Sequence, residues 1–196
     1  MAYMGQESYP KAAIELRDIL ENQADWERID QVLYQLAWTA KYQDDADSAD
    51  DFFQQLVEQK SDSGFAGEAW FHLGESAYKA ESFEQAGKQY TQAMELASND
   101  TVRNNARYKL AWTQFKTRKW QTAAEGFSKL VEVAKEPLKS QAQFMSGESL
   151  FEAKKFGPAL EAYQACLATL ESTQEVSDAM KPVSYTHLTL PTTDRV

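Results

Sequence analysis

Apolar and small residues recur every three or four positions between Ala69 and Ala97, and a polar break at Glu81–Ser82 divides this stretch in two. This spacing predicts two amphipathic α-helices, each with one apolar face. Small residues stand where the two helices would approach closely, and bulky residues fill the space between them. The small residues are Gly74, Ala86 and Ala93. The stretch therefore predicts two helices packed side by side and joined by a short turn.

The same pattern occurs four times along the chain, at steps of 37, 37 and 36 residues. Corresponding positions in the second helix of each pair form three aligned columns. These columns are Ala49, Ala86, Ala123 and Ala159; Phe53, Tyr90, Phe127 and Tyr163; and Leu56, Ala93, Leu130 and Cys166. A helix pair repeated at this period predicts an all-α solenoid, in which each unit buries its apolar faces against its neighbours.

Four helix-pair repeats are predicted within residues 26–171. The pairs are 26–42 with 46–60, 65–80 with 83–97, 101–117 with 120–135, and 138–154 with 157–171. Ser63 and Asp100–Thr101 are predicted N-caps, because their side-chain oxygens can accept hydrogen bonds from the free backbone N–H groups of a first turn.

Both ends of the chain differ from the four central units. Residues 1–22 predict a partial repeat that is truncated at the N-terminus, because the second-helix columns continue one period upstream. The positions that continue them are Ala12, Leu16 and Ile19. Residues 172–181 begin like a further repeat. Residues 182–193 then lose the helical periodicity and resemble the conceptual translation of a transposase-based sequencing adapter. We expect 182–196 to be a non-native tail, with a natural β-prone tail as the alternative.

The unit from Ala69 to Ala97 resembles a tetratricopeptide repeat in its spacing and in its alternation of small and bulky positions. This resemblance implies a right-handed α-solenoid with a concave groove, lined mainly by the first helix of each pair. It also implies a non-enzymatic role in binding a peptide or partner protein. The units are longer than the roughly 34 residues of the common repeat. Such longer units are similar to those of bacterial cell-envelope members, such as the Tol–Pal coordinator and outer-membrane assembly lipoproteins, which favours the periplasm or cell envelope over the cytoplasm.

The resemblance further implies which side chains line the groove. The groove-facing positions of the family fall here on Tyr34, Gln35, Trp38, Tyr42, His72, Glu75, Lys79, Lys109, Trp112, Lys116, Met145 and Glu148. Trp38 and Trp112 occupy a position that holds glutamate in the second and fourth units, so apolar anchors would alternate with acids. Exposed aromatic side chains are typical binding anchors, and packing of both tryptophans on neighbouring helices is the alternative. Inter-unit packing is expected of Tyr34, Phe71, Tyr108 and Phe144.

Charge and composition argue against several classes of function. The net charge of −10 argues against nucleic acid or an anionic lipid surface as the ligand. No apolar run approaches the roughly 20 residues that cross a bilayer, so we expect no membrane insertion.

His72 is the only histidine before residue 182, and neither a phosphate loop nor a metal-ligand spacing accompanies it. We therefore expect no enzyme activity, cofactor or metal. The acidic run from Asp44 to Asp51 lacks the glycine of a calcium loop and predicts a solvated turn.

These observations favour a protein-interaction scaffold that binds a peptide or partner protein in its groove, with no expectation for its oligomeric state. Two alternatives stay open. In the first alternative, the chain is a structural spacer or an oligomerisation module. In the second, it is an appendage of a larger envelope-associated protein or enzyme.

Overall fold

The computed structural model describes residues 9–23 and 25–173 of the chain. Within these residues the secondary structure consists of nine α-helices joined by short turns. The helices are α1 (Tyr9–Asn22), α2 (Ile29–Tyr42), α3 (Ala46–Gln59), α4 (Ala66–Lys79), α5 (Phe83–Leu96), α6 (Asp100–Lys116), α7 (Trp120–Val131), α8 (Leu138–Glu152) and α9 (Phe156–Thr173). The further repeat predicted at 172–181 and the tail predicted at 182–196 lie outside the described residues, apart from Ser172 and Thr173 at the end of α9.

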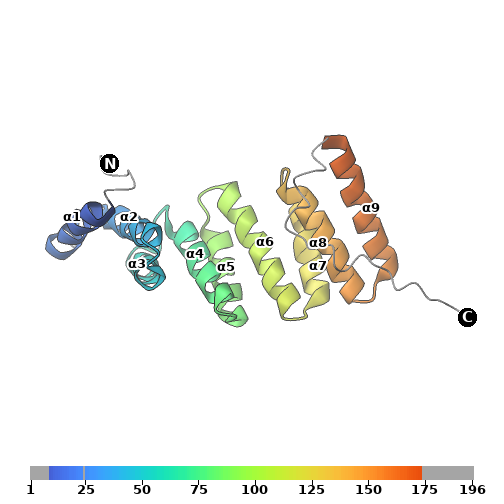
Figure 1. Cartoon of the computed structure of the whole chain (residues 1–196), viewed down its shortest axis with the longest axis horizontal. Coiled ribbons are helices and arrows are strands. Elements are labelled where there is room, and N and C mark those ends of the chain that lie inside the picture. The colour runs from blue at the N-terminus through green and yellow to red at the C-terminus, as the bar shows by residue number, and fades with distance from the viewer. Residues whose placement is uncertain (1–8, 24, 174–196) are drawn as a thin grey trace, which may run out of the picture.

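The helices follow one another in chain order along the long axis of the molecule, from α1 at one end to α9 at the other (Figure 1). Each helix packs against the next one in the sequence, and α4 also packs against α6. Helices α2, α4, α6 and α8 are the first members of the predicted pairs, so the α4–α6 contact joins the first helices of two neighbouring pairs. This arrangement confirms the predicted all-α solenoid.

Most helix ends lie within two residues of the predicted ones, and two ends differ by more. Helix α2 begins at Ile29 rather than at residue 26, because the preceding residues form a turn in which the Ile29 N–H donates to the Trp26 carbonyl at 3.1 Å. Helix α7 ends at Val131 rather than at residue 135. Just beyond it, the N–H groups of Val133 and Ala134 both donate to the carbonyl of residue 130, which closes the helix in a tight turn.

The two predicted helix caps are each shifted. Helix α6 is capped one residue earlier than predicted, because Asn99 Oδ1 accepts from the Val102 N–H at 3.0 Å. Ser63 lies before α4 and accepts from the Phe65 N–H at 3.1 Å, while its hydroxyl donates to Asp30 at 2.6 Å. Ser63 therefore fixes the link between α3 and α4 to the start of α2 instead of capping the first turn of α4.

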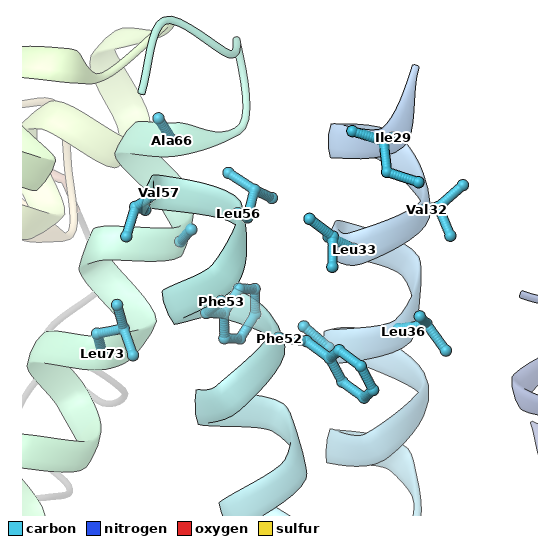
Figure 2. Close-up of a cluster of buried hydrophobic side chains, with 12 residues drawn as sticks. Ile29, Val32, Leu33, Leu36, Phe52, Phe53, Leu56, Val57, Ala66 and Leu73 are labelled. Atoms are coloured by element: carbon cyan, nitrogen blue, oxygen red, sulfur yellow. The ribbon is translucent and has the colours of Figure 1, made fainter. Parts of the chain in front are cut away.

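The aligned columns form the interior of the solenoid. Every member of the alanine column and of the Leu–Ala–Leu–Cys column is at most 4% exposed. In the aromatic column Phe53, Tyr90 and Phe127 are fully buried, whereas Tyr163 is half-buried. Figure 2 shows one of the resulting clusters, where side chains of α2, α3 and α4 converge. The core is therefore a row of interfaces between neighbouring helices rather than a single centre.

Candidate functional site

Eleven of the twelve predicted groove residues are partly or fully exposed on the first helices α2, α4, α6 and α8. Gln35 is half-buried, and Lys79, the last residue of α4, is exposed. Met145 is the exception, because it is only 4% exposed. This position of α8 faces the core cluster that it shares with Ala111 and Phe127, so its prediction as a groove residue is wrong.

Tyr34, Trp38 and Tyr42 lie one helical turn apart along α2 and form an aromatic row. Tyr42 is 54% exposed, and its ring stacks on Tyr9 of α1 with 4.8 Å between ring centroids. The Trp38 ring meets His72 of α4 edge-on at 4.9 Å, and Lys41 Nζ lies 5.3 Å from the Trp38 ring centroid. The row is therefore held in part by packing on the neighbouring helices α1 and α4.

His72 joins α4 to the preceding pair of helices. Its ring stacks on Phe53 of α3 at 5.0 Å, and its Nδ1 lies 2.9 Å from Lys41 Nζ. Its Nε2 lies 3.9 Å from Glu68 Oε1, and hydrogen bonding to His72 lowers the pKa of the Glu68 carboxyl. Burial, together with the neighbouring Glu68, raises the pKa of Tyr34 to about 12. The surroundings of His72 are those of a helix interface.

The two glutamates among the predicted groove residues accept hydrogen bonds from tyrosines of the second helices, Tyr90, which is buried, and Tyr163, which is half-buried. The Tyr90 hydroxyl of α5 donates to Glu75 Oε1 at 2.5 Å, and the Tyr163 hydroxyl of α9 donates to Glu148 Oε1 at 2.6 Å. A tyrosine that packs between helices needs an acceptor for its hydroxyl. Each glutamate supplies that acceptor from the first helix of the same pair.

The same two units also share a glycine directly before the glutamate. A Cβ atom added to Gly74 would lie 2.7 Å from the Tyr90 ring, and one added to Gly147 would lie 2.6 Å from the Tyr163 ring. The first and third units instead combine phenylalanine in the second helix with an Ala–Trp pair in the first. The alternation of tryptophan and glutamate along the groove therefore coincides with two different ways of packing a helix pair.

Two of these positions also contact the next pair of helices. Trp38 meets His72 of α4 edge-on at 4.9 Å, and Glu75 pairs with Lys109 of α6 at 2.9 Å. Trp112 packs on the cluster that contains Phe127 and Met145. Trp38 and Glu75 therefore help to hold neighbouring pairs together.

The buried tyrosine hydroxyls predict a loss of stability at alkaline pH. Burial and the hydrogen bond to Glu75 raise the pKa of Tyr90 well above its ordinary value of 10.0. The folded protein keeps this proton while the unfolded chain loses it, so the contribution is complete below about pH 10 and falls by about 1.4 kcal/mol per pH unit above it. We expect urea unfolding from about pH 9 to about pH 11 to show that Tyr90→Phe removes up to that amount from the slope above about pH 10 and leaves the slope below it unchanged. The exposed Tyr42→Phe is the control, and equal slopes for the two variants would contradict the assignment.

A hollow of about 260 Å³ lies between the first helices α4 and α6. Its lining consists of Tyr78 from α4 and of Tyr108, Lys109, Trp112 and Lys116 from α6. The Trp112 ring is fixed by edge contacts with Phe115 at 5.6 Å and with Phe127 at 6.3 Å. Three of the predicted groove residues therefore come together here, beside two further aromatic rings.

Tyr78 is absent from the predicted groove residues, and inter-unit packing is the role that the sequence favours for Tyr108. Tyr78 stands seven residues after Phe71, two helical turns along the same face of α4, and this spacing is the signal that could have identified it. Tyr108 has both roles, because its ring meets Phe127 edge-on at 5.6 Å and also lines the hollow. Burial raises the pKa of both tyrosines, so both hydroxyls are neutral at physiological pH.

Two other surface features differ from this hollow. A depression of about 530 Å³ at the start of α5 is lined only by residues of the single segment 82–88. On α9, Phe156, Leu160 and Leu167 are each more than half exposed, and their spacing places them along one face.

The part of the chain that the structure describes contains no group of three acidic, histidine or cysteine side chains that could hold a metal ion. No helix in that part is long and apolar enough to cross a membrane.

Comparison with known proteins places this fold among known helical repeats. MamA superposes with a TM-score of 0.70 at 18% sequence identity, over 86% of this chain and 92% of that chain. PilF from Pseudomonas aeruginosa superposes with a TM-score of 0.60 at 18% identity, over 85% of this chain and 71% of that chain. At such low identity these structures share the fold alone. No curated protein sequence matches the chain significantly.

The fold defines a helical-repeat scaffold of the class that mediates protein–protein interactions. The sequence model of the Tetratricopeptide repeat-like domain matches residues 11–183. The chain belongs to this family.

Proposed function

We propose that the chain binds an extended segment of a partner protein across its first helices, and that the hollow between α4 and α6 anchors this segment. The observation that carries the proposal is the convergence of three aromatic rings and two lysines from neighbouring pairs on one hollow. Aromatic side chains that line a concave site are the usual anchors of protein recognition. The proposed activity is binding alone.

The fixed positions of the rings favour binding. Trp112 is held by Phe115 and Phe127, and Tyr78 meets Phe83 of α5 edge-on at 5.4 Å. A partner therefore meets side chains that are already ordered, so that less conformational entropy is lost on association. The repeat packing also fixes the distance between α4 and α6, because both helices contact each other directly.

A structural role is the second candidate, and the exposed apolar row on α9 is the observation in its favour. In a solenoid, such a face is covered by a neighbouring unit. A spacer or oligomerisation module that works through α9 would not need the hollow between α4 and α6. The same experiment therefore separates the two candidates.

The experiment is selection of a random peptide library on the immobilised full chain, followed by binding of the enriched peptides to variants. We expect Trp112→Ala, which removes an anchor, and Lys116→Trp, which fills the hollow from an exposed position, to weaken binding at least about tenfold. Lys88→Trp is the matched control, because Lys88 is also exposed but lies on α5 away from the hollow. Circular dichroism melting shows whether each variant remains folded.

Two results would contradict the proposal. One is that no peptide is enriched over an unrelated control protein. The other is that enriched peptides bind the folded Lys116→Trp variant as well as they bind the Lys88→Trp variant.

A further inference from the structure

Lys109, Trp112 and Lys116 form a stripe along one face of α6. They are spaced three and four residues apart, which places them in line on a helix surface, and all three line the hollow. The two lysines are two helical turns apart, or about 10.5 Å along the helix axis. The stripe therefore presents an indole ring between two cations at a defined spacing.

Lys109 is held in place before any ligand arrives. Its Nζ lies 2.9 Å from Glu75 Oε2 and 5.8 Å from the centroid of the Tyr78 ring. The other carboxylate oxygen of Glu75 accepts from the buried Tyr90, so the ion pair is anchored to the interior of the solenoid. An ammonium group has three N–H donors, and the bond to Glu75 leaves donors on Lys109 for a second acceptor.

The charged side chains that line the hollow are both lysines, Lys109 and Lys116, of which Lys109 is paired with Glu75. The chain carries a net charge of −10, yet the end of α6 and the following turn hold three cations within four residues. These cations are Lys116, Arg118 and Lys119. Like charges in contact across an interface are unfavourable, so this surface selects an anionic segment and rejects a basic one.

We propose that the partner segment carries two acidic side chains three residues apart, with an apolar or aromatic residue between them. This inference rests on the proposed function. In an extended polyproline II segment, which has three residues per turn, side chains three residues apart lie on the same face about 9 Å apart, close to the axial spacing of Lys109 and Lys116. The two carboxylates pair with the two lysines, and the residue between them packs on Trp112 and Tyr78.

Synthetic peptides with acetylated and amidated ends test this rule against the full chain by rhodamine fluorescence anisotropy. The test peptide is SGEFAEGS, the charge control is SGQFAQGS, and the spacing control is SGEEFAGS, which has the same composition as the test peptide. We expect the test peptide to bind at least about tenfold more tightly than either control. We also expect its binding to weaken in about 0.5 M NaCl, because surface charge pairs are screened by salt.

Variants of two exposed lysines test which cation binds the peptide. Lys116 and Lys88 are both exposed lysines, but Lys116 lines the hollow and Lys88 lies on α5 away from it. We expect Lys116→Ala to weaken binding of the test peptide about fivefold or more, and Lys116→Arg to retain most of it. Lys88→Ala should bind like the wild type.

Several outcomes would overturn the inference. One is that the test peptide does not bind detectably. Another is that the glutamine peptide or the adjacent-acid peptide binds equally well. The last is that Lys116→Ala and Lys88→Ala weaken binding equally. Library selection distinguishes this failure from a failure of the proposed function. Enriched peptides that depend on Trp112 but lack paired acids would overturn the acidic rule and leave the scaffold function standing. Enriched peptides that do not depend on Trp112 would overturn both.

Discussion

Replacing Phe53 with alanine is expected to lower the free energy of unfolding by about 3–5 kcal/mol. The side chain is 0% exposed and belongs to the cluster in which α2, α3 and α4 converge (Figure 2). Its ring also stacks on His72 and meets Tyr34 edge-on at 6.4 Å, so its removal leaves a cavity at the junction of two helix pairs. Urea unfolding followed by circular dichroism measures the effect.

The damage should also be local, because each helix packs mainly against its sequence neighbours. Hydrogen exchange of the Phe53→Ala variant should show the largest loss of protection in α2, α3 and α4, and a smaller loss in α8 and α9. Phe156→Ala is the matched control, since Phe156 is 59% exposed on the second helix of its pair. The control should change stability by no more than about 0.5 kcal/mol. A loss below about 1 kcal/mol for Phe53→Ala would contradict the fold described above.

Replacing Gly67 with alanine is expected to cost about 2–3 kcal/mol. A Cβ atom at this position would lie 2.7 Å from both the backbone nitrogen and the Cα atom of Ala97, and 2.8 Å from the carbonyl carbon of Leu96. Backbone atoms cannot rotate away as a side chain can, so α4 would have to move from the end of α5. Alanine favours the helical conformation over glycine by about 1 kcal/mol, which offsets only part of this cost.

Gly157→Ala is the matched control for Gly67→Ala. Gly157 also lies in a helix, but no atom lies within 4 Å of the position of its added Cβ. This substitution should leave stability unchanged or raise it by up to about 1 kcal/mol. Chemical denaturation of both variants gives the comparison, and equal effects in the two would show that the close approach of α4 to Ala97 is absent.

The helices and the interior of this molecule are predictable from the sequence because both depend on local periodicity. The position of Ala86 in its column, for example, is repeated in three other units, and all four alanines are buried. Helix ends are less predictable, because they depend on single hydrogen bonds such as the one from the Val102 N–H to Asn99. The periodic pattern does not determine these bonds.

The set of side chains that line the predicted groove is harder to predict from the sequence, because the direction of a side chain depends on which helix packs beside it. Met145 and Lys109 occupy equivalent positions in the first helices of neighbouring pairs, yet Met145 is buried and Lys109 lines the hollow. Lys109 is half-buried, and Glu75 in the preceding pair binds its ammonium group. Met145 instead belongs to the cluster against which Trp112 packs. Such differences between equivalent positions arise only once neighbouring units are in contact.

The central claim is that the hollow between α4 and α6 is the place where a partner segment binds. The most direct test is the dissociation constant of one peptide enriched on the full chain, measured for the wild type and for the Lys116→Trp and Lys88→Trp variants. The account predicts binding at least about tenfold weaker for Lys116→Trp and unchanged for Lys88→Trp. The same dissociation constant in all three folded proteins would contradict it.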